Sequence, residues 1–320
     1  MTAIVTPNPL LLGQGLPPFN AIQPEHVVPG IHQLIDDLSA ELEDLEKTVS
    51  PNWGGLVEPL TRIEERLRWS WGIVGHLMGV KNSPELRTAY QEVQPALVQF
   101  ASRMGQSQPI YKAFKHLRQG AAWSQLSSAQ QRIVESAIRE AELSGVGLEG
   151  EAKERFNQIQ QELAELSTQF SNNVLDATKA FGLKLTTQEE VEGLPPSLLG
   201  LSAQAAREAG DADATAESGP WLITLGYPSF GPFLQHSRRR DLREKIYRAY
   251  ITRASKGELD NTPLIDRTLA LRQEMVELLG YGTYAELSIA RKMAPSVDAV
   301  IGLMEELRSA SHDAAQKELD

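Results

Sequence analysis

The stretch "EAKERFNQIQQELAELSTQFSNNVLDATKAF", residues 151–181, decides the fold class of this 320-residue chain. Its apolar side chains recur at intervals of three and four residues, the repeat that places them on one face of an α-helix. They are Phe156, Ile159, Leu163, Leu166, Phe170, Val174, Ala177 and Phe181. Such a face packs against a neighbouring helix, and phenylalanines at this spacing are more often core than a cofactor slot. The stretch therefore predicts the longest helix of a helical protein.

The segment that leads into this helix, "SGVGLEGE" (residues 144–151), contains Gly145-x-Gly147-x-x-Gly150, the letter pattern of a dinucleotide-binding turn. That turn works only where a buried strand delivers the first glycine and a helix begins at the third. The preceding residues 128–143 follow a helical repeat and contain no run of apolar β-branched residues. We therefore expect no nucleotide site, and we predict that Gly145 ends a helix.

Most of the remaining chain shows the same helical repeat, interrupted by Gly, Pro or Asn-Ser. Helices are predicted within residues 27–45, 54–80, 83–105, 108–120, 128–143, 195–210, 240–255, 263–281, 283–293 and 296–320. Residues 221–234, "WLITLGYPSFGPFL", alternate apolar and other side chains before a Gly-Tyr-Pro turn and predict a small hairpin. The expected fold is all-α, a multi-helical lobe with long amphipathic helices and one small β-hairpin. An extended N-terminal arm over residues 1–24 should precede the lobe over residues 25–320.

Composition narrows the function classes. The formal net charge is −11, which disfavours extended phosphate binding and therefore nucleic-acid partners. The most basic segment, "SRRRDLREK" (residues 237–245), mixes arginines with acids and is typical of a solvated helix start. There is no cysteine, so disulfides and thiolate metal sites are excluded. The N-terminal residues predict neither a signal peptide nor a membrane anchor, so we expect a cytoplasmic protein with no membrane partner.

A search for chemistry finds no catalytic constellation. The six histidines are His26, His32, His76, His116, His236 and His312. None pairs with another at the i, i+4 spacing of a helical zinc site, and no His-Glu-x-x-His occurs. Asp211-x-Asp213 resembles the start of a calcium loop but lacks the later glycine and glutamate. The paired carboxylates Asp36–Asp37, Glu64–Glu65 and Glu189–Glu190 lie in polar settings. We therefore predict no catalytic, cofactor-binding or metal-ligating residue, and the substrate-binding residues stay unknown.

One short phrase, "YRAYITRAS" (residues 247–255), places Arg248 and Arg253 where they could hold a peptide carboxylate. Tyrosine and arginine interleaved on a helix are more often engaged in packing, with the charged ends reaching solvent. The sequence favours the packing role and leaves the binding role open.

Longer phrases show a resemblance to a known family. "NPLLLGQGLPPFNAIQPEHVVPGI" (residues 8–31), "LSGVGLEGEAKERFNQIQQELAELSTQFSNNVLDATKAF" (residues 143–181) and "YRAYITRAS" resemble the oligopeptidase A branch of the thimet oligopeptidase family. The similarity extends over essentially the whole chain. It implies a nearly all-helical zinc metallopeptidase, cytosolic or organellar, whose two lobes form a deep channel that admits short peptides and excludes folded proteins.

The resemblance also implies chemistry that this chain does not carry. The family uses His-Glu-x-x-His on a helix and a further glutamate ligand to hold zinc, with the motif's glutamate as general base. The chain matches only the family's N-terminal part, so no catalytic residue is carried over. Zinc is thus expected in the full-length family and not in this chain, which should be inactive alone.

Three functions remain open from the sequence. The favoured one is the N-terminal lobe of an oligopeptidase, truncated at residue 320, which forms one wall of the substrate channel and meets the missing C-terminal catalytic part. The alternative is a stand-alone, non-catalytic helical protein that binds peptides or a peptidase. A peptidase with a different active site is the third. Because the apolar pattern of residues 296–320 has no helix stop signal, we expect an exposed apolar patch there.

Overall fold

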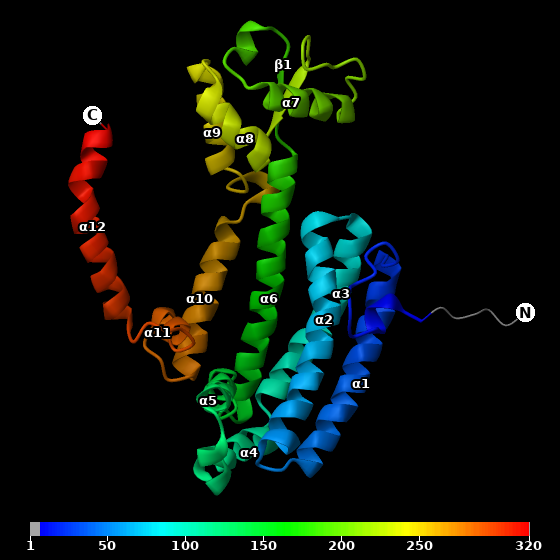
Figure 1. Ribbon diagram of the computed structural model, residues 1–320, viewed down its shortest axis with the longest axis vertical. Coiled ribbons are helices and arrows are strands. Elements are labelled where there is room, and N and C mark those ends of the chain that lie inside the picture. The colour runs from blue at the N-terminus through cyan, green and yellow to red at the C-terminus, as the bar shows by residue number, and fades with distance from the viewer. Residues whose placement is uncertain (1–6, 320) are drawn as a thin grey trace, which may run out of the picture. The chain divides into compact units, whose positions relative to one another are not determined.

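The structure is a computed structural model that describes residues 7–319, and its regular elements are almost all helices (Figure 1). The α-helices are α1 (Val27–Thr48), α2 (Glu58–Val80), α3 (Pro84–Gly105), α4 (Gln108–Gln119), α5 (Ser128–Leu143), α6 (Gly150–Lys179), α7 (Pro196–Glu208), α8 (Tyr227–His236), α9 (Arg240–Ile251), α10 (Thr262–Leu278), α11 (Tyr284–Ile289) and α12 (Val297–Leu319). Two four-residue strands, β1 (Gly182–Leu185) and β2 (Trp221–Thr224), pair antiparallel. The predicted all-α fold with one small two-stranded element is confirmed.

The chain divides into two compact units. The first runs up to Ala164 and resumes at Ala270, and the second is Glu165–Leu269. The first unit has two apolar clusters, and α1 packs against α2, α3 and α4. Helix α1 contributes four leucines to one cluster, and Val27 and Ile31 to the other. The N-terminal arm joins this core, since Leu10 and Ile22 are buried and short helical turns form at Pro9–Leu11 and Pro24–His26.

The core of the second unit surrounds β2. Trp221 and Ile223 point into it and are almost completely buried, and α7, α8 and α9 supply the surrounding apolar side chains. The strand pairs Leu185 with Trp221 and Gly182 with Thr224. The alternation of buried and exposed residues along both strands is that of a small sheet with one face in the core.

The predicted site of the hairpin is only half right. Residues 221–224 form the strand, but the chain then enters α8 instead of a second strand. Pro228 stands in the first turn of α8, where a missing N–H costs nothing, and the Ser229 hydroxyl accepts a 3.0 Å bond from the Thr224 N–H. The partner strand is β1, which ends at Leu185, 36 positions before β2 begins at Trp221. It has only four residues, and two of them are buried leucines.

The glycine segment before α6 is a joint between helices, as predicted. Gly145 has φ +80°, its N–H bonds the Glu142 carbonyl at 3.1 Å, and the Val146 N–H bonds the Ala141 carbonyl at 3.1 Å. These two bonds define a Schellman motif that closes α5. The structure describes no strand between residues 7 and 144, so the segment lacks the strand–turn–helix context of a dinucleotide site.

Helix α6 forms over the predicted stretch, but its apolar face is buried unevenly. Phe156 and Ile159 are almost fully buried in the first unit. Farther along, Leu163 and Val174 are only partly buried, and Phe170 is 39% exposed. The apolar repeat therefore predicts the helix correctly and overstates how much of its face is covered within the described residues.

Candidate functional site

The histidines and acids show no metal centre in the part of the chain that the structure describes. Residues 7–319 contain no group of three or more His, Asp or Glu side chains placed to hold a metal ion. His26 accepts a 3.0 Å bond from the Gln23 N–H, and the His76 ring lies against Phe19. These contacts give two of the histidines local structural roles, and the absence of metal ligands stays a prediction.

The acidic pairs noted in the sequence have separate surroundings. Glu190 accepts bonds from the Thr186 and Thr187 N–H groups at 2.8 and 3.0 Å, and these bonds lower the pKa of its carboxyl. Burial raises the pKa of Glu64, and the charge of Arg68 offsets only part of that effect. Asp211 of the suspected calcium loop forms an ion pair with Lys184. Each of these three carboxyls therefore has its own surroundings, and the contacts described here do not pair any of them with a second carboxyl.

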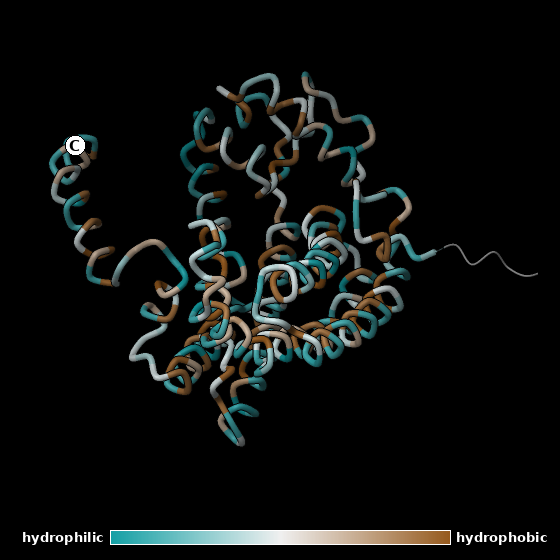
Figure 2. The backbone as a smooth tube through the Cα atoms, turned by 60° about the horizontal axis from the view of Figure 1, so that its bottom comes forward, coloured by the Kyte–Doolittle hydropathy of each residue, from teal (hydrophilic) through white to brown (hydrophobic). Residues whose placement is uncertain are grey.

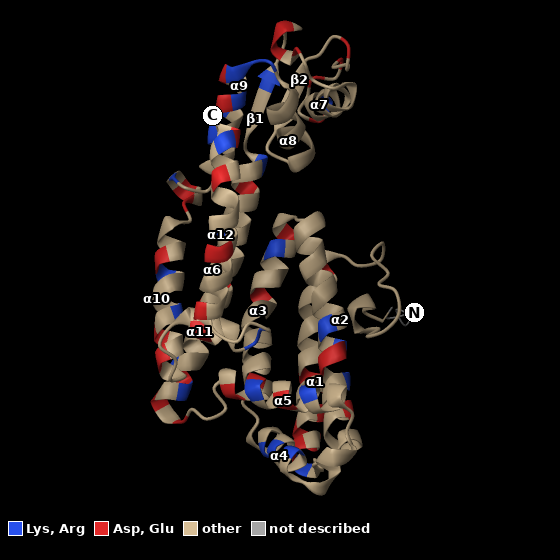
Figure 3. Ribbon diagram, turned by 60° about the vertical axis from the view of Figure 1, so that its left-hand side comes forward, with Lys and Arg blue, Asp and Glu red and all other residues tan. Residues whose placement is uncertain are grey.

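The arginine-rich segment before α9 is occupied by local ion pairs. Arg238 contacts Glu192 at 2.7 Å, and Arg239 contacts Asp241 at 2.8 Å and Glu189 at 3.6 Å. Figure 3 shows basic and acidic positions close together along the ribbon at α9. The arrangement fits a solvated helix start rather than a basic patch.

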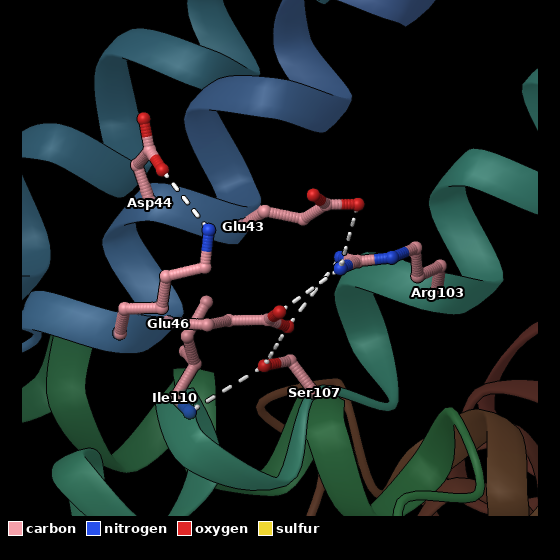
Figure 4. Close-up of polar contacts among 7 residues, drawn as sticks. Glu43, Asp44, Glu46, Arg103, Ser107 and Ile110 are labelled. Carbon is pink, nitrogen blue, oxygen red and sulfur yellow. Dashed lines mark hydrogen bonds and ion pairs between the residues drawn. The ribbon is translucent and has the colours of Figure 1, made fainter.

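A polar cluster at one end of α1 was not foreseen from the sequence (Figure 4). Arg103 of α3 lies 2.9 Å from Glu46 and 3.9 Å from Glu43, both on α1. The Ser107 hydroxyl donates a 2.7 Å bond to Glu46 and lies 3.5 Å from the Ile110 N–H at the start of α4. The cluster joins the ends of three helices and caps one of them, so its role is structural.

Helix α12 presents apolar side chains that no other described residue buries. None of its described residues is buried, and the side chains of Ile301, Leu303, Met304, Leu307 and Leu319 are each more than half exposed. Figure 2 shows apolar positions repeating along this helix among polar ones. The segment just before it is held to α5, because Arg291 pairs with Glu140 at 3.1 Å and Arg139 donates to the Ala290 carbonyl. The predicted exposed apolar face is confirmed for α12, and its size marks it as a candidate interaction surface.

The two arginines of "YRAYITRAS" have different environments. Arg248 pairs with Glu244 one turn earlier on α9, at 2.8 Å. Arg253 lies over the ring of Tyr250, with its guanidinium carbon 3.8 Å from the ring centre. Tyr250 is stacked on Phe230 of α8 at 4.0 Å between ring centres. The packing role predicted for this phrase is therefore seen for Arg253, whereas Arg248 is exposed and paired with a carboxylate. Of these two arginines, Arg253 is the one without a described carboxylate partner.

Two family models match separate parts of the chain. Residues 31–153 match the model of the N-terminal domain of neurolysin and thimet oligopeptidase. Residues 233–320, which include α12, match the model of peptidase family M3. No helix among residues 7–319 is long and apolar enough to cross a membrane.

Curated relatives agree with these matches. The organellar oligopeptidase A of Arabidopsis thaliana, chloroplastic or mitochondrial, is 54% identical over 98% of this chain and 39% of its own length. The probable cytosolic oligopeptidase A of the same plant is also 54% identical, over 44% of its length. Oligopeptidase A of Haemophilus influenzae is 40% identical over 98% of this chain and 46% of its own length. The chain thus spans less than half the length of these relatives.

The helical chain thus joins a match to an oligopeptidase N-terminal domain to a match to peptidase family M3. The chain belongs to the family of oligopeptidase A and thimet oligopeptidase, and the resemblance carried by the quoted phrases is confirmed.

Proposed function

We propose that this chain is the N-terminal part of a zinc metalloendopeptidase of the oligopeptidase A type, which hydrolyses short peptides. In this proposal the chain forms one wall of the substrate channel, and a C-terminal part supplies the chemistry. The observation that carries it is α12, whose apolar face is uncovered although the helix lies inside the peptidase-family match. An apolar helix face of this kind needs a partner, and the remaining length of the relatives offers one.

Zinc belongs to the proposed whole enzyme and not to the residues in hand. A hydrolytic zinc takes three protein ligands and an adjacent base, and the described residues do not fit that requirement. No catalytic step is therefore assigned to this chain. Its proposed contribution is to bind and orient a short peptide and to keep water and folded proteins away from the channel.

Two further assignments complete the proposal. We place the protein in the cytoplasm, with support from the cytosolic and bacterial relatives, although one relative is organellar. We also keep residues 1–24 as an N-terminal arm and residues 25–320 as the lobe that the C-terminal part recognises. The stand-alone peptide-binding protein is the competing function.

The reading frame after the Asp320 codon and the metal content of the chain test the proposal together. We expect an open frame that leads to His-Glu-x-x-His. We also expect the purified 320-residue chain to hold no stoichiometric zinc and to leave short peptides intact. A stop codon directly after Asp320 would favour the stand-alone protein. About one zinc per chain with chelator-sensitive cleavage would show an active site within the chain itself.

A further inference from the structure

A column of three side chains stands at the end of α9 in the second unit. The rings of Phe230 and Tyr250 are stacked with 4.0 Å between their centres and 16° between their planes. The Arg253 guanidinium carbon lies 3.8 Å from the same Tyr250 ring centre. Two groups this close cannot share one face of a ring, so Tyr250 is held between the phenyl ring and the guanidinium. This contact restricts where the guanidinium can lie.

The backbone around Arg253 is also fixed. One guanidinium nitrogen donates a 2.9 Å bond to the Tyr250 carbonyl. The next residue, Ala254, has φ +52°, a conformation that costs a non-glycine residue of order 1 kcal/mol or more and persists only when its surroundings impose it. The surroundings are visible: the Asn261 N–H bonds the Ala254 carbonyl at 2.9 Å, and the Asn261 amide bonds the Phe170 carbonyl at 3.1 Å.

The charge of Arg253 is not neutralised by any described acid. Its guanidinium contacts the Tyr250 ring and the Tyr250 carbonyl, so most of its five N–H donors remain available. Arg248, five residues earlier, differs because it is paired with Glu244. Arg253 is thus a partly buried guanidinium without a described acidic partner, in a chain whose net charge is −11.

We propose that Arg253 is an anchor for the carboxylate of a bound peptide, which deepens the proposed function and rests on it. A planar guanidinium held by stacking presents two parallel N–H groups, the geometry that matches a carboxylate. Tyr247 and Ile251, on the same turns of α9 as Tyr250, are about half exposed and offer apolar contact area beside the anchor. The carboxylate can come from the peptide's C-terminus or from an acidic side chain.

The test is peptide binding by the intact 320-residue chain, measured by isothermal titration calorimetry without zinc or hydrolysis. The probes are acetyl-Ala-Ala-Phe-Ala with a free C-terminus, the same peptide amidated, and amidated acetyl-Ala-Glu-Phe-Ala. We expect the free acid to bind at least about tenfold more tightly than the plain amide. Equal recovery of affinity by the glutamate peptide would assign the anchor to acidic side chains as well as to the C-terminus.

Three variants connect the result to Arg253. Arg253→Gln should remove the preference for the free acid, and Arg253→Lys should retain only part of it because the charge stays and the planar fork is lost. Arg248→Gln is the matched control, since it removes one positive charge from the same helix and should leave the preference intact.

Circular dichroism would reveal a variant that misfolds. The comparison of the free-acid and amidated peptides on the wild-type chain does not depend on any variant. Equal binding of acid and amide, no binding of either, or an unchanged preference in folded Arg253→Gln would each overturn the proposal. None of these outcomes depends on zinc-dependent cleavage, so they leave the proposed function to its own test.

Discussion

Arg155 of α6 and Glu274 of α10 form a two-point ion pair, although 119 residues separate them in the chain. The second contact, from the terminal guanidinium nitrogen to the second carboxylate oxygen, measures 2.6 Å. Within the first unit, this pair joins the start of α6 to α10. It lies just ahead of α11 and α12 and so positions the segment that carries the uncovered apolar face.

Arg155→Gln should loosen α10 and the helices after it more than it lowers the overall stability. The reason is that the pair is partly exposed, whereas the main apolar clusters of the unit do not depend on it. Hydrogen exchange should show faster exchange in residues 270–319. The control is Arg118→Gln, which breaks the exposed Arg118–Glu135 contact at 3.4 Å. Identical exchange patterns in the two variants would contradict this role.

Glu64 should make stability depend on pH. Burial raises the pKa of its carboxyl above the ordinary value of 4.5, so the folded state favours the protonated form. The raised pKa of Glu64 therefore contributes to the free energy of unfolding in full below pH 4.5, and this contribution is lost as the pH rises through the pKa of the folded state. Glu64→Gln should therefore raise the melting temperature at pH 7.5 and leave it nearly unchanged at pH 4. Glu65→Gln, one residue along and exposed, should show no such difference.

Gly145→Ala should destabilise the chain by about 1–2 kcal/mol, because Gly145 has φ +80° and an added Cβ would approach Leu148 to 3.0 Å. Chemical denaturation measures the loss. Gly147→Ala is the control from the same glycine pattern, since nothing lies within 4 Å of a Cβ at that position. If both substitutions had equal effects, the Schellman joint would not explain the glycine.

Two buried serines in the second unit should respond in opposite directions. The Ser202 hydroxyl is buried without a hydrogen-bond partner, so Ser202→Ala should stabilise the chain by about 0.5–1 kcal/mol. Ser229 accepts the Thr224 N–H, so Ser229→Ala should cost about 1 kcal/mol or more by leaving that donor unpaired. Thermal unfolding of the two variants side by side decides the matter, and a loss of stability in Ser202→Ala would contradict the first statement.

Long helical repeats in the sequence predict most of the helices. Segments too short to show a repeat, such as the two strands, are harder to predict. The face of α6 and the stop at Gly145 follow from spacing and backbone chemistry alone. Strand β1 could not be predicted, since four residues with two buried leucines are too short for a repeat to be recognised. The alternating pattern predicts its partner β2 correctly. It also predicts a second strand where α8 forms, because Gly226-Tyr227-Pro228 suits a hairpin turn as well as the start of a helix.

The candidate surfaces show the same limit. The unfinished apolar repeat predicted the exposed face of α12, because every apolar position there lies on one continuous helix. The cluster around Arg103 joins three helices, and no local pattern announces contacts between residues 57 positions apart. For Arg253, the local sequence shows an arginine among tyrosines, whereas Phe230 and Asn261 reach its surroundings only through the fold.

We propose that a C-terminal part of a peptidase covers the apolar face of α12. Titration of the separately expressed C-terminal part into the 320-residue chain tests this proposal, with cleavage of a fluorogenic short peptide and light scattering as the two readouts. We expect a stoichiometric complex with chelator-sensitive cleavage, and Met304→Glu on α12 should weaken both. A monodisperse chain that ignores the C-terminal part and gains no activity would contradict it.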